Sequence, residues 1–174
     1  KLRESMRFEI SAIQKKMHIT VIYVTHDQSE AMAMSDRVVV MSAGVVQQIG
    51  HPHDIYSNPV NKMVADFIGL VNFVKGSVQG DRVFIKGTEV SFPNTNGVSG
   101  DNVTVAVRPE NITISKTAGA LAGVVRHSFF LGDSTDFRIE CGKHMFRVIV
   151  KGVDATAFPD GTNVFLDFSK VMLF

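Results

Sequence analysis

The sequence predicts an α+β protein in which a short α/β segment is followed by an all-β domain. Residues 2–16 carry apolar side chains at helical spacing, and residues 19–24 form an unbroken apolar run typical of a strand covered on both faces. After Gly69 the pattern changes to many short segments separated by glycine-containing turns, which is typical of a small barrel. We therefore predict two domains, residues 1–69 and residues 70–174.

The first predicted helix has an apolar stripe that recurs every three or four residues. Its members are Leu2, Met6, Ile10, Ile13 and Met17. This helix and the strand at residues 19–24 make up half of a helix–strand repeat of a doubly wound sheet, whose other strands are not in this sequence. Because an unpaired strand exposes its backbone donors and apolar faces, we expect residues 1–50 to repack, most simply by pairing with a second copy of the chain.

His26 comes at the carboxyl end of the predicted strand, where parallel sheets place their ligand-handling groups. Asp27 and Glu30 have the spacing of a capping box, so we expect a helix to begin at about Gln28. Taken alone, a single histidine is more often satisfied by nearby backbone groups than engaged with a ligand. Asp27 could cap the helix or lie near a metal ion, and the cap is favoured because it needs no ligand.

Three further short elements complete the first predicted domain. Residues 38–41 and 45–49 flank Gly44, which predicts an antiparallel hairpin with a positive φ at the glycine. Pro52 suits the first turn of a short helix, and a second short helix is expected over residues 61–68.

The second predicted domain consists of short strands. Turn dipeptides such as Gly80-Asp81 and Asn96-Gly97 separate them. The expected strands are residues 73–78, 82–85, 89–92, 103–108, 111–115, 123–130, 135–140, 145–150 and 164–168. We expect them to form one closed or nearly closed barrel, with room for a second, incomplete lobe.

Composition narrows the classes of function. The chain of 174 residues is 45% hydrophobic and 20% charged, as ordinary globular domains are. Its formal net charge is +1, with Lys and Arg scattered, so no nucleic-acid partner is expected. The single cysteine, Cys141, allows no internal disulfide and is expected to be structural. The remaining histidines lack metal-ligand spacing, so no metal site is expected among them; they are His18, His51, His53, His127 and His144.

The segment around His26 resembles the switch-histidine segment of ATP-binding cassette (ABC) ATPases, in particular the ATP-binding subunits of binding-protein-dependent importers. The residues that carry this resemblance are Thr25, His26, Asp27, Gln28, Glu30, Ala31, Asp36, Arg37, Val40 and Met41. Similar residues precede it at Lys1, Leu2 and Arg3 and follow it at Gly44, Gln48, Gly50, Pro52, Ile55, Tyr56, Pro59, Val64, Ala65, Phe67, Ile68 and Gly69. Val107, Arg108, Pro109, Glu110 and Ile112 resemble the Arg-Pro-Glu signature of the TOBE domain.

The resemblance implies a partial α/β remnant of an ABC nucleotide-binding domain over residues 1–69 and an all-β, OB-like TOBE barrel over residues 70–174. In the family the matching histidine contacts the γ-phosphate, which would make His26 the switch histidine of the full-length protein. The family also implies ATP and Mg²⁺, a homodimer, permease subunits in the membrane, and a cytoplasmic location on the inner face of the cell membrane. Because some related barrels bind small oxyanions, Arg108 and Glu110 are weak candidates for ligand or regulatory contacts; the alternative is a strand-ending turn with a surface ion pair.

The phosphate-binding loop of that family has no counterpart in the sequence. The pattern Gly-x-x-x-x-Gly-Lys-Ser/Thr, which cradles phosphates, is missing, and so are the signature motif and the metal-binding Asp with the catalytic Glu. The chain by itself is therefore expected to bind no ATP or metal and to be inactive. A stand-alone dimerisation or oxyanion-binding barrel is the alternative function. Ferric iron, phosphonate, polyamine, sulfate and sugars all stay open as the transported solute.

Overall fold

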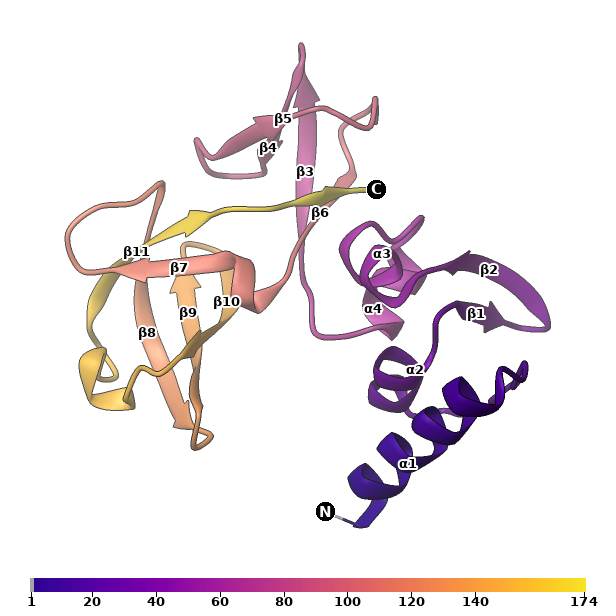
Figure 1. The fold of residues 1–174 in the computed structure, drawn as a ribbon. Helices are drawn as coiled ribbons and strands as arrows, with labels where there is room; N and C mark the ends of the chain where they lie inside the picture. The colour runs from indigo at the N-terminus through magenta and orange to yellow at the C-terminus, as the bar shows by residue number, and fades with distance from the viewer. Residues whose placement is uncertain (1) are drawn as a thin grey trace. The chain divides into compact units, whose positions relative to one another are not determined.

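A computed structural model describes residues 2–174, with the side chains of residues 2–5, 7 and 8 outside the description. The chain forms two compact units, Lys1–Gly69 and Leu70–Phe174 (Figure 1). Lys1 and the side chains of Leu2 and Arg3, which carry part of the resemblance to ABC ATPases, lie outside the described residues. No helix in the described part of the chain is long and apolar enough to cross a membrane.

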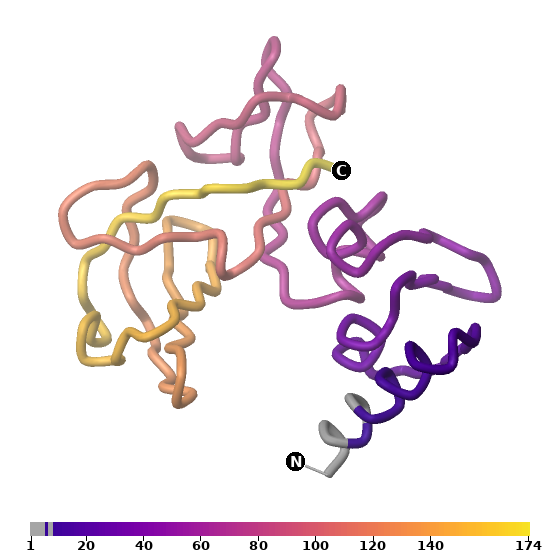
Figure 2. Tube along the Cα trace, viewed as in Figure 1, coloured from indigo at the N-terminus to yellow at the C-terminus, as the bar shows by residue number. Residues whose placement is uncertain are grey.

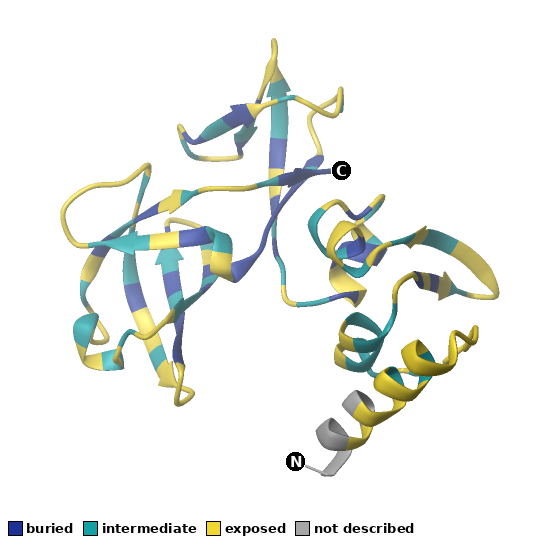
Figure 3. Ribbon diagram, in the orientation of Figure 1, coloured by how far each residue is buried: buried dark blue, intermediate teal, exposed yellow. Residues whose placement is uncertain are grey.

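The first predicted helix is confirmed as α1, Leu2–Met17. Its apolar stripe does not face a core, because Met6, Ile13 and Met17 keep 50–60% of their surface exposed. The half-buried positions among its described side chains are Ser11 and Gln14 instead. Figure 3 shows the described part of this helix as largely exposed. Among the described side chains, none of this stripe belongs to either hydrophobic core cluster.

The strand predicted at residues 19–24 is wrong. These residues have no regular secondary structure, and Ile22 and Val24 are 88% and 92% exposed. A strand needs a neighbour for its backbone N–H and C=O groups, and no strand within the described residues 2–174 pairs with this segment. The apolar run carries strand propensity, but without a partner the backbone stays in the solvent.

The rest of the first unit follows the predictions closely. Helix α2 spans Gln28–Met34, and strands β1, Val38–Ser42, and β2, Val45–Gly50, form the hairpin. Its turn has positive φ at both Ala43 (48°) and Gly44 (77°), as a two-residue turn with the right-handed strand twist requires. The short helices are α3, Pro52–Ser57, and α4, Lys62–Phe67. Their core is small and consists of Val38, Val40, Ile55, Val64 and Ile68.

The second unit contains two antiparallel sheets of five strands each, with the orders β12-β6-β3-β4-β5 and β10-β9-β8-β11-β7. The first sheet is made of β3 (Asn72–Gln79), β4 (Arg82–Ile85), β5 (Ser91–Pro93), β6 (Val103–Val107) and β12 (Met172–Leu173). The second is made of β7 (Ile112–Ser115), β8 (Leu121–Phe130), β9 (Ser134–Cys141), β10 (His144–Lys151) and β11 (Asn163–Phe168). Two short 3-10 helices, η1 (Pro109–Asn111) and η2 (Ala155–Ala157), lie in the connections.

All nine predicted strands are present with small shifts at their ends, whereas β12 was not predicted. The all-β character of residues 70–174 is confirmed. Where one closed or nearly closed barrel with a possible second lobe was expected, the structure has two curled sheets of five strands each. In the trace of Figure 2 the last residues return to the first sheet, where β12 pairs with β6. A strand of two residues is too short to show an alternating pattern.

One hydrophobic core joins the two sheets of the second unit. The Phe168 ring at the end of β11 lies 5.8 Å from the Phe92 ring in β5 and 5.5 Å from the Phe146 ring in β10, so it touches both sheets. The predicted alternation in β9 and β10 is confirmed, since Phe137, Ile139 and Phe146 are fully buried. Aromatic side chains of this size supply much of the burial that stabilises such a core.

Cys141 is buried in this core, with 1% of its surface exposed. Burial, reinforced by the neighbouring Glu140 carboxylate, raises the pKa of the thiol from 9.0 to about 11. Above pH 9 the thiol of the unfolded chain ionises while the folded one stays protonated, so this residue's contribution to stability is lost as pH rises towards 11. The full loss is on the order of 3 kcal/mol.

We expect the free energy of unfolding of the second unit, measured by urea denaturation between pH 8 and pH 11, to fall more steeply in the parent chain than in a Cys141→Ala variant. The variant has no thiol to titrate. Lysines and tyrosines ionise in the same pH range in both proteins, so the difference between the two slopes reports the cysteine alone. Equal slopes in the two proteins would contradict this account of Cys141.

Candidate functional site

His26 lies in the loop that leads into α2, and its side chain is exposed. Hydrogen bonds fix the residues on either side of it. Thr25 Oγ1 donates to Glu30 Oε2 over 2.8 Å, and the backbone N–H of Asp27 donates to Thr25 Oγ1 over 2.9 Å. The hydroxyl of Tyr23 donates to the same Glu30 oxygen over 2.8 Å. Two of these bonds tie the loop to Glu30 in the first turn of the helix and the third lies within the loop, while the imidazole stays accessible.

The capping prediction is confirmed for Asp27 but not for Glu30. Asp27 Oδ1 accepts the backbone N–H of Glu30 over 3.1 Å, as an N-cap does. In a full capping box, Glu30 would reach back to the N–H of Asp27. Here that N–H donates to Thr25, and the Glu30 carboxylate accepts the Thr25 and Tyr23 hydroxyls instead. Glu30 thus organises the loop before His26.

An apolar groove of about 510 Å³ lies between α2 and α3. Its lining residues are Gln28, Ser29, Met32, Pro52, His53, Tyr56, Ile68 and Gly69. His26 is not among them. Phosphate groups require several N–H or cationic donors, and His53 is the only residue in this lining whose side chain can carry a positive charge. The groove is therefore a poor match for the phosphates of a nucleotide.

The two residues of the Arg-Pro-Glu segment differ in their surroundings. Arg108 is buried, with 2% of its surface exposed, and its Nη1 donates to the backbone carbonyl of Leu70 over 3.2 Å. Glu110 is exposed on the 3-10 helix η1. The arrangement gives Arg108 a partner in the backbone of its own unit, and the ligand role stays a prediction for both residues.

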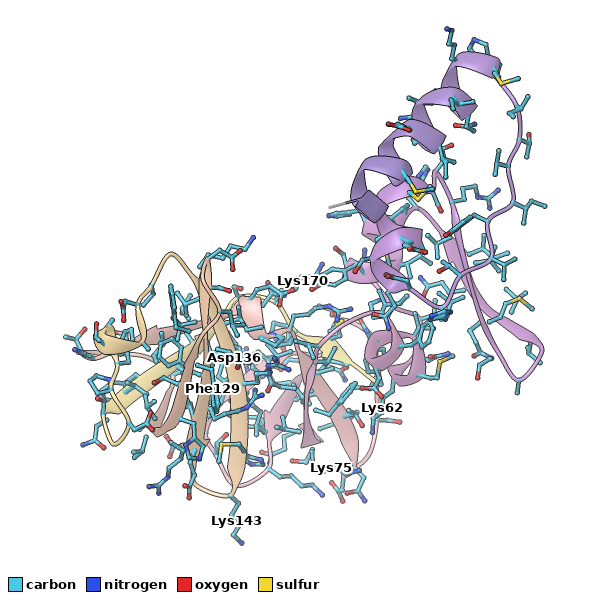
Figure 4. The ribbon with its side chains drawn as sticks, turned by 90° about the horizontal axis from the view of Figure 1, so that it is seen from below. Lys62, Lys75, Phe129, Asp136, Lys143 and Lys170 are labelled. Atoms are coloured by element: carbon cyan, nitrogen blue, oxygen red, sulfur yellow. The ribbon has the colours of Figure 1, made fainter. Side chains whose placement is uncertain are left out.

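A buried ionic network in the second sheet was not predicted from the sequence. Asp136 in β9 is 4% exposed; its Oδ1 accepts Arg138 Nη1 over 3.1 Å, and its Oδ2 accepts Arg147 Nε and Nη2 over 2.9 and 2.6 Å. Figure 4 shows Asp136 beside Phe129, its cross-strand partner in β8. The spacing of Asp136 and Arg138 was a usable signal, because residues two apart share one face of a strand.

Asn72 at the start of β3 connects this region to the first sheet. Its side-chain Nδ2 donates to the carbonyls of Val107 (3.2 Å) and Arg147 (2.8 Å), and its Oδ1 accepts the backbone N–H of Arg147 over 2.7 Å. Asn72 is 7% exposed. Among the described residues, no group of three or more His, Cys, Asp or Glu side chains gathers where it could hold a metal ion.

Comparison with known proteins finds similarity to a TOBE domain and to transport ATP-binding proteins. Residues 105–173 match the TOBE domain family, a range that begins in β6, contains the whole second sheet and ends in β12. The chain is 42% identical over 146 residues to the spermidine/putrescine import ATP-binding protein PotA of Ruegeria pomeroyi, covering 80% of this chain and 40% of PotA.

It is also 40% identical over 173 residues to the Fe(3+) ions import ATP-binding protein FbpC of Fusobacterium nucleatum, covering 95% of this chain and 46% of FbpC. The chain is therefore homologous to the C-terminal region of the ATP-binding subunits of ABC importers, and it spans less than half the length of these relatives. A solved structure of the cytoplasmic molybdate-binding protein ModG aligns with 60% of this chain and 94% of its own, with a TM-score of 0.44 and 11% identity.

Proposed function

We propose that the chain is the C-terminal part of an ABC importer's ATP-binding subunit, which hydrolyses ATP to drive solute uptake. In this proposal residues 1–69 complete a nucleotide-binding domain, and residues 70–174 form its accessory TOBE domain. The observation that carries the proposal is the 40% identity to FbpC, which extends over 95% of the chain and so includes the His26 loop.

The exposed apolar surface of the first unit supports the same proposal. The stripe of α1 and the segment at residues 19–24 together leave many large apolar side chains in water. Contiguous apolar surface of this kind marks a site of contact with further protein. In the proposed full-length subunit, residues from the remainder of the nucleotide-binding domain pack on these faces.

His26 is the proposed switch histidine, which donates a hydrogen bond to the γ-phosphate as negative charge develops during hydrolysis. The contacts of Glu30 with Thr25 and Tyr23 and the Asp27 cap hold the loop in place before a nucleotide binds. This chain has no phosphate-binding loop, so ATP and Mg²⁺ are bound by the region that the relatives have outside the aligned part. The subunit acts as a homodimer with permease subunits at the cytoplasmic face of the membrane.

The proposal is limited to the class of import ATPase. PotA is named for spermidine and putrescine and FbpC for ferric ions, yet their identities to this chain are 42% and 40%. Such similar values favour neither solute.

The proposal is tested by joining the N-terminal part of the Fusobacterium FbpC, up to the start of the aligned region, to this chain. We expect the fusion to hydrolyse ATP, and His26→Ala to lower kcat by about 10²-fold, the usual cost of removing one donor to a developing charge. The affinity for a non-hydrolysed ATP analogue should change little.

His51→Ala is the matched control, because His51 is also exposed and makes no side-chain hydrogen bond to the helix that it precedes. A fusion that binds ATP but hydrolyses it at the same rate with and without His26 would refute the role of His26. A folded fusion with no ATPase activity would count against the proposed function as a whole.

A further inference from the structure

We infer that the joint between the two units is a single residue, Gly69, and that Arg108 and Asn72 are the positioning residues that confine it there. The inference concerns the backbone on either side of the joint. It stands independently of nucleotide chemistry, because every contact that supports it lies within one unit or the other.

On the side of the first unit, the ordered structure extends to Ile68. The backbone N–H of Ile68 donates to the carbonyl of Val64 over 3.0 Å and closes the last turn of α4. Its side chain is 6% exposed and belongs to the core cluster with Val38, Val40 and Ile55. Both the backbone and the side chain of Ile68 are therefore fixed to the first unit.

On the side of the second unit, the ordered structure begins at Leu70. The Leu70 side chain is 48% exposed and so contributes little to holding this residue. Its carbonyl, however, accepts a hydrogen bond from the buried guanidinium of Arg108. A hydrogen bond from a charged donor is about twice as strong as a neutral one. The backbone of Leu70 is thus held by the interior of the second unit.

Two residues later Asn72 fixes the chain to both sheets. Its three side-chain hydrogen bonds reach Val107 in β6 and the backbone of Arg147 in β10. Asn72 also pairs with Val107 in the register of β3 and β6. A rotation that begins at the joint must therefore carry strands of both sheets with it as one body.

Gly69 is what remains between these two anchors. Glycine has the widest range of accessible φ and ψ, and hinges are commonly one or a few residues that absorb such changes. The location also accounts for the burial of Arg108, in a unit whose other arginines lie nearer to the solvent. An apolar side chain at this position would leave the Leu70 carbonyl without this donor, and a lysine would offer it a weaker one.

The test is ¹⁵N relaxation measured along residues 66–74 of the whole 174-residue chain. In the parent we expect order parameters of about 0.85 at Ile68 and from Leu70 to Asn72, with a minimum at Gly69 below about 0.6. Arg108→Gln should extend the low values through Leu70 and Val71. Arg108→Lys, which keeps a charged donor, should restore the ordering at least in part.

Arg82→Gln is the control. Arg82 also donates to a backbone carbonyl, that of Ser91 over 3.0 Å, but it is exposed and lies away from the joint. This variant should leave the profile unchanged. Uniform order parameters across residues 66–72 of the parent would overturn the single-residue joint. An unchanged profile in folded Arg108→Gln would overturn the role of Arg108.

Asn72→Ala keeps the test decisive if Arg108→Gln does not fold. Because this variant loses all three side-chain hydrogen bonds, the mobile stretch should lengthen to include residue 72. A folded Asn72→Ala protein with the parent profile would overturn the role assigned to Asn72.

Discussion

Asp136→Asn is expected to lower the free energy of unfolding of the second unit by about 3 kcal/mol, the lower end of the range for breaking a buried ion pair. Asp136 is 4% exposed and accepts hydrogen bonds from Arg138 and Arg147. Asparagine has nearly the same shape but removes the negative charge between two guanidinium groups. The arginine side chains keep 29–32% of their surface in water, which limits the cost because solvation compensates in part.

Urea denaturation followed by circular dichroism measures this loss, and Asp160→Asn is its control. Asp160 Oδ2 also lies near a nitrogen, His127 Nδ1, at 3.8 Å, but both side chains are more than half exposed. Exposed pairs contribute at most about 1 kcal/mol, so this second variant should be close to the parent. Equal losses in the two variants would show that the Asp136 network does not stabilise the sheet in the way described.

Gly123→Ala is expected to destabilise the second unit by about 3 kcal/mol or more, the upper part of the range for overpacking a core. A Cβ atom at Gly123 would lie 2.5 Å from Cys141 Sγ, 2.9 Å from the carbonyl oxygen of Glu140 and 2.9 Å from Ile139 Cγ2. One of these atoms belongs to the backbone of β9, which cannot move without disturbing its pairing with β8 and β10.

The double variant Gly123→Ala/Cys141→Ala makes this prediction specific. Removing the Sγ atom eliminates the shortest contact. The loss in free energy of unfolding in the double variant should therefore be smaller than the sum of the losses in the two single variants. The difference should exceed the roughly 0.5 kcal/mol within which independent sites add. Gly50→Ala is the tolerated comparison, since its added Cβ would have no neighbour nearer than 3.4 Å. Strict additivity in the double variant would argue against the clash.

Local sequence patterns predicted most of the elements but not the contacts that hold them together. Alternation in β9 and β10 and the glycine turns identified the strands because those signals lie within a few residues of one another. The segment at residues 19–24 was wrong for the opposite reason: its composition favours a strand, but a strand also requires a partner, which no local pattern supplies. The cap at Asp27 was correct because it is a local hydrogen bond.

The candidate site shows the same division. His26 was identified from its surrounding residues, whereas the contribution of Glu30 depends on Tyr23 seven residues earlier and was not foreseen. Arg108 was singled out as a ligand contact, yet in the structure it donates a hydrogen bond to the backbone carbonyl of Leu70, which is far away in the sequence. Asp136 and Asn72 were not singled out at all: the partners of Asn72, and Arg147 as a partner of Asp136, come from other strands.

The order of strands along the chain has a consequence for how the second unit folds. Strands β6 and β12 are neighbours in the first sheet, but the entire second sheet lies between them in the sequence. Closing so long a loop is entropically costly, and non-local pairings of this kind slow folding. The β8–β9 and β9–β10 pairs are local hairpins. We therefore expect the second sheet to form first and bring β6 and β12 together, so that docking of the final strand completes folding.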